Sequence, residues 1–455
     1  MHIRPRVGSF IVLVIAIVAS GVAAKIVGPN STAWGMRMTS LPISPDGMLI
    51  DGEMRHIYIV DQEHARIQLA VLAAPKGRLV ETWRTGAAGG IIWVGNDGLG
   101  AVSQSGHIFV LASSSGSMLM LSRSGRLLLR IAVGEATFAL AVDNRTQHVF
   151  VAAASGPDGT GTCGEGFVST FDATSGRLLR TVPTAPTASA NRKHTYCSFS
   201  LLNGPRAMAL DTRAGRLFVV GRMDHAPSPS KRLVSVVDTK TGGLLQSAAL
   251  GQGASEVAVD ELTGRAFVAG AAGVTIFDTK SGRPLHTVSI QGASGLAVAM
   301  QQGRVFVTST SHDDVYVLDA ATGMRLHTVS FPFTPYAPTI IAVSDRQVFV
   351  DHGSLAPAMP GPPKGSISVL DGATGEISGH IALEGKPVAA LADDKNRTLF
   401  VAVTVDRYGQ NLNEQKSLPW WREWIGILPW CQQKRTSPIG SASEMAMIRL
   451  PSTTR

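Results

Sequence analysis

The sequence predicts an all-β chain folded as a single β-propeller, on the evidence of its composition and of an internal repeat. The chain has 455 residues, of which 16% are charged, and it contains 48 glycines and 24 prolines. This wealth of turn-forming residues favours many short strands over a few long helices. A unit of roughly 40 to 50 residues, the period of propeller blades, recurs along the chain. Eight copies can be counted.

Each copy contains a short strand rich in valine and phenylalanine, which is its clearest mark. These strands occupy residues 56–60, 107–110, 148–151, 216–219, 265–268, 304–307, 347–350 and 398–401. A shorter apolar run precedes each of them, and a third strand, a reversal and a fourth strand follow. Four strands per unit, repeated around a closed ring, leave only short edges exposed, as in a β-propeller.

The reversal between the third and fourth strands has the pattern D-x-x-[ST]-G. It begins at Asp172, Asp238, Asp278, Asp319 and Asp371. An aspartate there can accept hydrogen bonds from backbone N–H groups two or three residues later, and the glycine supplies a positive φ. Because the placement is the same in each unit, we interpret these aspartates as structural rather than catalytic.

The two ends of the chain are expected to complete one blade together. The last unit has a candidate third strand at 444–450, with only five residues after it. We therefore expect the N-terminal segment around 36–41 to supply its missing outer strand. The sequence thus predicts eight blades. Seven blades are the alternative, because the second unit has a weak turn at 122–125 and irregular spacing before it.

The first 25 residues have the pattern of an export segment. Arg4 and Arg6 precede residues 7–24, which carry no charge and end in small side chains. This fits a signal peptide, and the uncharged length also reaches the lower limit for a membrane-spanning anchor. In either case the basic head stays in the cytoplasm and residues 26–455, the propeller domain, lie outside it. The sequence thus predicts an extracytoplasmic protein, secreted, periplasmic or on the outer face of the cell membrane.

The units GFVSTFDATSGRLLRTV, VTIFDTKSGRPLHTVSI and DVYVLDAATGMRLHTVSF resemble the YVTN-repeat (YncE-like) β-propellers of the quinoprotein amine dehydrogenase-like superfamily. The resemblance implies an exported propeller that either binds a partner or carries a cofactor. Two departures count against cofactor-bearing members. Val182, Val288 and Val329 stand where quinone-dependent alcohol dehydrogenases have a docking tryptophan, and no C-x-x-C-H haem motif is present. We therefore predict no cofactor.

Long insertions between the second and third strands are expected at 155–166, 221–232, 351–365 and 404–443. These connections all share one face, here called the upper face, and long loops on one face of a rigid scaffold commonly form binding sites. Neutral insertion into tolerant loops is the alternative.

Polar side chains at the upper ends of the strands are the candidate ligand-binding residues. They are His64, Asp224, His225, His312, Asp313, Asp351, His352 and Arg407. Imidazole and carboxylate groups suit divalent ions. However, each contribution comes from a different blade, and ordinary surface polarity explains the pattern equally well. No metal-ligand set and no catalytic residue can be assigned.

Two further predictions concern cysteine and tryptophan. Cys163 and Cys197 fall in upper-face connections of neighbouring units and are predicted to form a disulfide in an oxidising compartment, with free thiols as the alternative. In the last insertion, Trp420, Trp421 and Trp424 lie on one face of a predicted short amphipathic helix. That helix is expected either to contact a membrane or to cover the upper face as a lid.

Taken together, these features favour a binding module that takes a protein or small-molecule ligand on its upper face. The alternatives are an upper-face lyase or hydrolase of the lactonase type, or a diverged quinoprotein-type dehydrogenase. The net charge is +8, but the basic residues are spread along the sequence, so nucleic acid is not an expected partner.

Overall fold

The computed structural model describes residues 11–17, 36–38, 47–50, 56–61, 68–73, 78–84, 100–112, 116–134, 137–153, 166–184, 207–222, 232–250, 253–331, 338–344, 346–351, 365–383, 386–394 and 398–404. The chain divides into two compact units, Met1–Asp406 and Arg407–Arg455. All described residues belong to the first unit.

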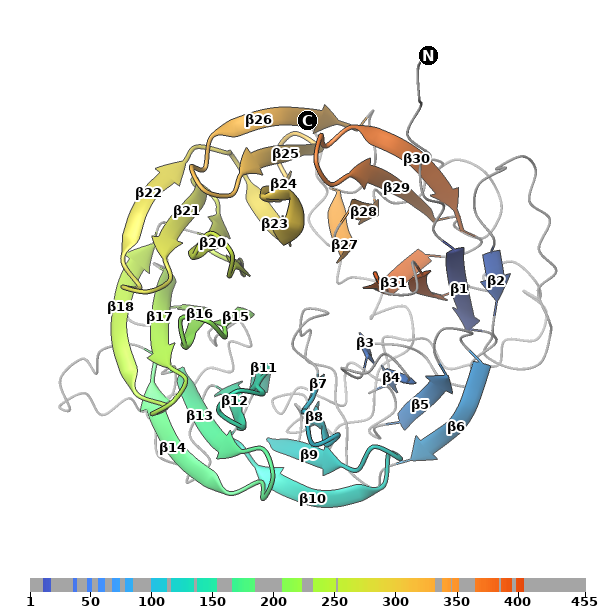
Figure 1. Cartoon of the computed structure of the whole chain (residues 1–455), viewed down its shortest axis with the longest axis vertical. Helices are drawn as coiled ribbons and strands as arrows, with labels where there is room; N and C mark the ends of the chain where they lie inside the picture. The colour runs from blue at the N-terminus through green and yellow to red at the C-terminus, as the bar shows by residue number, and fades with distance from the viewer. Residues whose placement is uncertain are drawn as a thin grey trace, which may run out of the picture. The chain divides into compact units, whose positions relative to one another are not determined.

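The first unit consists of four-stranded sheets arranged in a ring (Figure 1). Seven sheets each contain four consecutive strands and are here called blades 1 to 7. Blade 1 is β3 (Gly47–Ile50), β4 (His56–Asp61), β5 (Gln68–Ala73) and β6 (Arg78–Arg84). Blade 2 is β7 (Gly100–Val102), β8 (Ile108–Ala112), β9 (Ser117–Leu121) and β10 (Leu127–Ala132). Blade 3 is β11 (Thr137–Asp143), β12 (His148–Ala153), β13 (Phe167–Asp172) and β14 (Leu178–Pro183).

The remaining consecutive blades follow the same order. Blade 4 is β15 (Ala207–Asp211), β16 (Arg216–Arg222), β17 (Arg232–Asp238) and β18 (Leu244–Leu250). Blade 5 is β19 (Glu256–Asp260), β20 (Arg265–Gly270), β21 (Gly273–Asp278) and β22 (Pro284–Val288). Blade 6 is β23 (Ala293–Ala299), β24 (Arg304–Ser309), β25 (Asp314–Asp319) and β26 (Arg325–Ser330), with the 3-10 turn η3 (Met300–Gln302) after β23. Blade 7 is β27 (Thr339–Val343), β28 (Gln347–Asp351), β29 (Ser366–Asp371) and β30 (Ile377–Ala382).

A further four-stranded sheet, here called the closing sheet, is built from both ends of the chain. Its order is β2–β1–β32–β31, with β31 (Lys386–Asp393) and β32 (Thr398–Thr404) from the last unit. It lies between blades 7 and 1, because β31 contacts both β27 and β3. The prediction of a single all-β propeller is therefore confirmed. The eight-blade count that the sequence predicted first is not supported. Seven sheets are blades of four consecutive strands, as in the seven-blade alternative, and the closing sheet, built from both ends of the chain, fills the gap between the first and the last of them.

The N-terminal part of the closing sheet differs from the sequence prediction. Strand β2 (Met36–Met38) is at the outer edge, as expected, but it pairs with β1 (Ile11–Ile17). Strand β1 in turn pairs in parallel with β32 over its whole length. The segment 444–450, expected in that position, lies outside the described residues. Ile11–Ile17 cannot be a sheet strand and a membrane span in the same molecule, so its pairing with β32 does not support a membrane anchor. The assignment of residues 1–25 as a signal peptide or anchor stays a prediction.

One aromatic side chain in the second strand of every sheet is fully buried and packs against the next sheet around the ring. For example, Phe150 of blade 3 lies in one cluster with Leu217 and Val219 of blade 4. The same relation holds for the other sheets through Tyr58, Phe109, Phe218, Phe267, Phe306, Phe349 and Phe400. The strands recognised in the sequence are thus those that join one sheet to the next.

The aspartate turns have the structural role that the sequence predicted. Asp278 Oδ1 accepts hydrogen bonds from Ser281 N at 2.8 Å and Ser281 Oγ at 2.7 Å. The second oxygen, Oδ2, accepts a hydrogen bond from Arg265 Nη1 at 3.1 Å, across the strand pair β20–β21. The same ion pair joins Arg216 to Asp238 at 2.8 Å and Arg304 to Asp319 at 3.4 Å. In blade 2, Ser122 replaces the aspartate, and its hydroxyl accepts a hydrogen bond from Arg126 N at 3.1 Å.

Turn glycines allow neighbouring blades to approach closely. Gly323 has φ +73°, and a Cβ there would overlap Ile276 Cδ1 and lie 2.9 Å from His286 Nε2, both in the preceding blade. Gly303 has a similar φ of +62°, but a Cβ would meet nothing within 4 Å. Both positions therefore favour glycine because of their positive φ, but only Gly323 also lacks the space for a side chain.

We expect Gly323→Ala to destabilise the propeller more than Gly303→Ala. Both changes introduce a left-handed alanine, at ~1–2 kcal/mol, while only Gly323→Ala also forces overlap between blades, at a further ~1–3 kcal/mol. Urea unfolding of both variants measures the difference. Equal losses of stability would show that the contact at Gly323 is relieved at no cost.

The ion pair at Asp278 should contribute stability that depends on pH. Hydrogen bonds from Ser281 lower the pKa of Asp278, and Arg265 lowers it further against the opposing effect of burial. A lowered folded-state pKa stabilises the fold above the unfolded pKa of about 3.9, and this contribution is lost as the pH falls through the folded value. Asp278→Asn should therefore cost ~0.5–1 kcal/mol at pH 7 and progressively less below about pH 4.

Asp371→Asn is the matched control for this change. Asp371 makes the same turn bonds, to Ala373 N, Thr374 N and Thr374 Oγ1. Its cross-strand neighbour is Gln347 instead of an arginine. The control should lose less stability at pH 7 than Asp278→Asn when unfolding is measured at several pH values, and an equal loss would argue against a contribution from Arg265.

Candidate functional site

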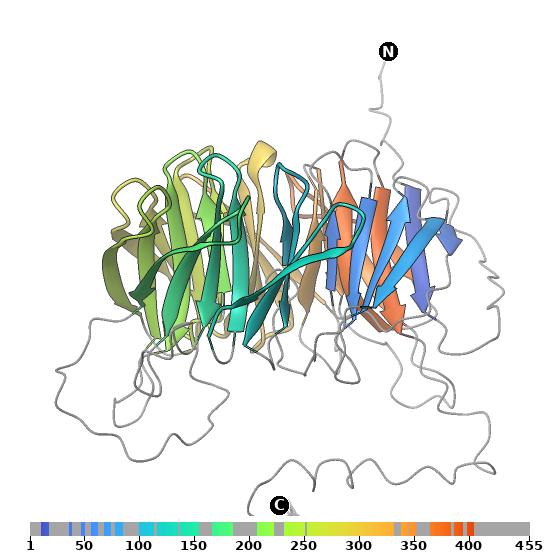
Figure 2. The same cartoon turned by 90° about the horizontal axis from the view of Figure 1, so that it is seen from below.

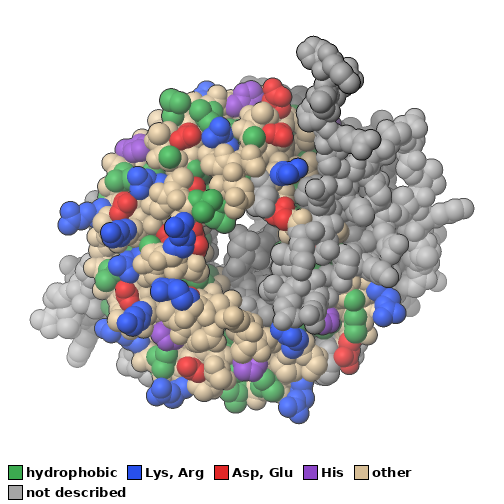
Figure 3. Space-filling model, viewed as in Figure 1, with side chains coloured by type: hydrophobic (Ala, Val, Ile, Leu, Met, Phe, Trp, Pro, Cys, Tyr) green, Lys and Arg blue, Asp and Glu red, His purple; other side chains and the backbone are tan. Residues whose placement is uncertain are grey.

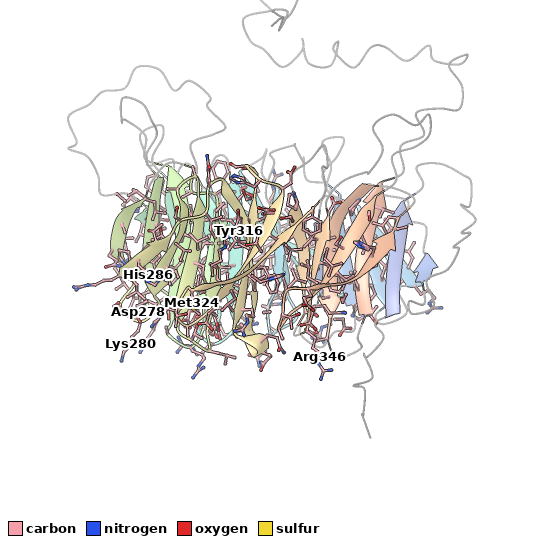
Figure 4. The ribbon with its side chains drawn as sticks, turned by 90° about the horizontal axis from the view of Figure 1, so that it is seen from above. Asp278, Lys280, His286, Tyr316, Met324 and Arg346 are labelled. Carbon is pink, nitrogen blue, oxygen red and sulfur yellow. The ribbon has the colours of Figure 1, made fainter. Side chains whose placement is uncertain are left out.

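The two faces of the ring are built from different connections. Turns from first to second strand, such as 144–147 and 261–264, and from third to fourth strand, such as 173–177 and 279–283, lie on what is here called the short-turn face. Figure 2 shows these turns along one edge of the ring, and Figure 4 shows Asp278, Lys280 and Arg346 at that edge and Tyr316 away from it. The other two kinds of connection share the upper face, where Thr310 N donates to Gly292 O at 2.9 Å.

The upper-face connections between second and third strands vary widely in length. Residues 271–272 and 310–313 suffice in blades 5 and 6, whereas 154–166, 223–231 and 352–365 are used in blades 3, 4 and 7. The insertion predicted at 221–232 is shorter than expected. Gly221 and Arg222 continue β16 and pair with Leu233 and Arg232, so the ladder extends further than the apolar pattern indicated. Asp351 likewise belongs to β28 and not to the following connection.

Three of the eight candidate ligand-binding residues lie in the described part of the chain. His312 and Asp313 are in the turn between β24 and β25, and Asp351 ends β28 in the next blade. His312 is exposed, while Asp313 and Asp351 are half-buried. All three therefore belong to the upper ends of blades 6 and 7, as expected from the repeat.

The other candidates fall outside the described residues. They are His64, Asp224, His225, His352 and Arg407, together with Cys163, Cys197, Trp420, Trp421 and Trp424. Their convergence at the channel mouth, the disulfide and the tryptophan helix stay predictions. Within the described ranges, no three His, Cys, Asp or Glu side chains are grouped so that they could hold a metal ion.

Asp313 has a backbone role that the sequence did not indicate. It adopts φ +51°, a left-handed conformation that is uncommon for a residue other than glycine. Its carbonyl oxygen accepts a hydrogen bond from Phe331 N at 3.2 Å, which ties this turn to the start of the connection into blade 7. The role of Asp313 in the structure is thus to hold the turn that presents His312.

Asp314, Tyr316 and Arg325 form a small charged cluster next to the turn 310–313. Tyr316 donates from its hydroxyl to Asp314 Oδ2 at 3.2 Å, and the guanidinium carbon of Arg325 lies 4.8 Å from the centre of the Tyr316 ring. Burial raises the pKa of Tyr316, and the Asp314 carboxylate raises it further, while Arg325 opposes both. Tyr316 therefore stays protonated as a hydrogen-bond donor, and the contact of its ring with Arg325 joins β25 to β26.

Two upper-face features were missed by sequence reasoning. The first is a small hollow between blades 4 and 5, lined by Leu250, Ala254, Val268, Gly270, Ala272, Gly273, Thr275 and Thr287. The hydroxyls of Thr275 and Thr287 lie 3.0 Å apart. Apolar walls with two hydroxyls suit the docking of a small side chain, and the lining contains no titratable group. The two-residue connection 271–272 is the sequence signal that could have revealed it.

The second upper-face feature that sequence reasoning missed is a set of hydrogen bonds between the inner strands of blades 5 and 6. Glu256 Oε2 accepts from Leu296 N at 3.2 Å, and Ser255 Oγ donates to Ser294 O at 3.2 Å. Thr308 Oγ1 accepts from Gly295 N at 2.9 Å. Because these groups satisfy one another, they hold the two inner strands together. No repeat position marks them, so the sequence pattern gave no signal.

A family model described as outer membrane protein assembly factor BamB matches residues 230–422. The match includes all strands from β17 to β32. The chain is a β-propeller, and over this stretch it is similar to that family. No curated protein matches the sequence of this propeller.

Solved structures agree with the fold of the propeller. The designed protein Ika8 aligns with a TM-score of 0.53 at 16% identity, covering 79% of this chain and 96% of Ika8. Sqt1 from Saccharomyces cerevisiae aligns with a TM-score of 0.52 at 9% identity, covering 76% and 88%. BamB from Moraxella catarrhalis aligns with a TM-score of 0.46 at 13% identity, covering 68% and 82%. At these identities the similarity to Ika8 and Sqt1 shows the fold alone.

In the described part of the chain, no helix is long and apolar enough to cross a membrane.

The backbone role of Asp313 can be tested with two substitutions. Asp313→Asn should leave stability nearly unchanged, because asparagine tolerates the left-handed conformation. Asp313→Val should cost ~1–2 kcal/mol, since a β-branched residue is strained at positive φ. Chemical denaturation measures both. If the two variants were equally stable, the turn would not depend on the conformation of residue 313.

Proposed function

We propose that this propeller is an extracytoplasmic protein-binding or assembly module that engages its partner through the upper face. The match of residues 230–422 to the outer membrane protein assembly factor model carries the proposal. It covers the third and fourth strands of blade 4, blades 5 to 7 and both C-terminal strands of the closing sheet. The proposed binding residues are the eight candidates named from the sequence, and no cofactor is required.

The uneven connections support the choice of face. Blades 5 and 6, with connections 271–272 and 310–313, are flanked by blades with connections of 223–231 and 352–365. Over these two blades the strands themselves come closest to the upper surface, and the apolar hollow at Gly273 and Thr275 opens there. A partner segment placed over blades 5 and 6 would meet this hollow and His312, with longer connections on both sides.

The chemistry of the described upper-face residues also supports binding over turnover. Glu256 accepts a backbone hydrogen bond, and Asp313 holds a turn through its own carbonyl. The hollow between blades 4 and 5 adds the hydroxyls of Thr275 and Thr287 and small side chains such as Ala272. Such groups provide shape and hydrogen bonds for a protein partner.

Site-specific photo-crosslinking in cells tests this proposal. Benzoylphenylalanine replaces His312 on the upper face in one strain, and Lys280 on the short-turn face in another. We expect a discrete protein adduct with the first variant and none with the second, because only the first position faces the proposed partner. Mass spectrometry of the adduct would identify the partner.

Two outcomes would contradict the proposal. Protein adducts from Lys280 alone would place the partner on the opposite face, and absence of any protein adduct from His312 in the expressed, folded variant would remove the support for this surface. The double variant Thr275→Trp and Thr287→Trp, which fills the hollow, should abolish the His312 adduct by occupying the space the partner uses.

A further inference from the structure

Among the described residues of blades 3 to 5, the exposed charged side chains are all basic, whereas the carboxylates are half-buried or buried. Among the described residues from β11 to β22, no aspartate or glutamate is exposed, whereas seven arginines and lysines are. These seven are Arg145, Arg177, Arg180, Arg213, Lys240, Lys280 and Arg283. They are widely separated in the sequence, which is why the sequence pattern indicated dispersed surface charge. The fold brings them together on three adjacent blades.

The seven cations, here called the basic arc, mark the short-turn face. Arg145 and Arg213 lie in turns between first and second strands, while Lys240 and Lys280 lie in turns between third and fourth strands. Figure 3 shows blue side chains along the left side of the ring, with red side chains between them, over the region of β14, β18 and β22 in Figure 1. The basic arc therefore faces away from the proposed partner surface.

Some of these cations reach across blade boundaries. Arg145 Nη2 in blade 3 lies 2.8 Å from the position that a Cβ of Gly215 in blade 4 would take. Arg180 Nη1, also in blade 3, lies 3.6 Å from the corresponding position at Gly243, in the turn that contains Lys240. The basic arc is thus continuous from one blade to the next and not a set of isolated side chains.

The acidic residues beneath the basic arc are already engaged. Asp238 and Asp278 form ion pairs with the half-buried Arg216 and Arg265. Glu261 Oε1 accepts hydrogen bonds from Thr212 N at 2.7 Å and Thr212 Oγ1 at 2.8 Å, joining the turns of blades 4 and 5. Since these carboxylates serve the turns themselves, the outermost layer presents cations to an approaching surface.

Exposed leucines alternate with the cations on the same blades. Leu178, Leu245, Leu262 and Leu285 are between 41% and 53% exposed. Leu262 is in the turn beside Glu261, and the other three lie near the start of the outer strands, next to the turn cations. A surface that mixes basic and apolar side chains in this way matches the boundary between lipid headgroups and acyl chains.

We propose that the basic arc docks the protein on the anionic headgroups of a lipid bilayer. Arg177, Lys240 and Lys280 stand on turns of equal length in three adjacent blades, 173–177, 239–243 and 279–283, so their tips form a broad surface instead of a groove for one peptide. Basic residues near an anionic membrane contribute additively. Docking in this orientation leaves the upper face directed away from the membrane, and the inference does not depend on the proposed function.

Vesicle sedimentation with the full-length protein tests the proposal. The probes are vesicles of phosphatidylcholine alone and vesicles containing phosphatidylglycerol. We expect binding that increases with phosphatidylglycerol and falls at high salt. Lys240→Gln with Lys280→Gln should weaken the phosphatidylglycerol-dependent part at least tenfold, on the basis of about fivefold for each cation removed. Any binding through the N-terminal segment is common to the unchanged protein and the variants, so the difference between them reports the basic arc.

Matched variants separate charge from structure. Lys240→Arg with Lys280→Arg keeps the charge and should bind as the unchanged protein does, and His312→Gln on the upper face should also have no effect. The proposal would be overturned by equal binding to both vesicle types, or by phosphatidylglycerol-dependent binding that survives Lys240→Gln with Lys280→Gln. Binding to polyglutamate without binding to anionic vesicles would overturn it too and would indicate an acidic protein as the occupant.

Discussion

The packing of one aromatic side chain from each sheet into the next is the interaction on which this propeller depends. Phe150, Phe218 and Phe267 illustrate it in three successive blades, each fully buried among residues of its own sheet and the following one. Deleting a buried phenylalanine typically costs ~3–5 kcal/mol. Because the contact always runs to the next sheet, no blade buries its apolar surface without a neighbour, and the ring must close to satisfy the first and the last.

Because the sheets must pack against one another around the ring, the connections on the two faces differ in how much they can vary. On the short-turn face, aspartates, arginines and glycines lock the turns and join neighbouring blades, as at Asp278 and Gly323. These turns have little freedom to vary in length. On the upper face, the described residues repeat a backbone hydrogen bond after the outer strand, as from Leu383 N to Gly365 O, instead of a side-chain lock, and the connections range from 271–272 to 352–365. Recognition of a partner can change there without altering the packing of the sheets, while the uniform turns can still carry a pattern of surface charge.

Features that recur in every blade could be predicted from the sequence, and features found in one blade could not. The repeated phenylalanine strands and aspartate turns were recognisable because every blade needs the same chemistry at the same place, as Phe306 and Asp319 show. The hydrogen bonds of Glu256 occur at one place, so no repeat marks them. Asp313 stands where Gly116, Gly166 and Gly365 accept the same backbone hydrogen bond in other blades, so the repeat does not mark an aspartate there. The basic arc could not be predicted from the sequence for a different reason. Arg145 and Lys240 are neighbours only after folding, and a linear pattern cannot show which turns become adjacent.

The parallel pairing of β1 with β32 has a mechanical consequence. Ile11 lies opposite Thr398 and Ile17 opposite Thr404, so the chain enters β1 at one end of the pair and leaves β32 at the other. Tension applied between the two chain ends would therefore slide these strands along each other. It would load all the hydrogen bonds of the pair together instead of opening them one by one. A propeller held at one end of its chain and pulled at the other would resist that force through a shear joint located in its closing sheet.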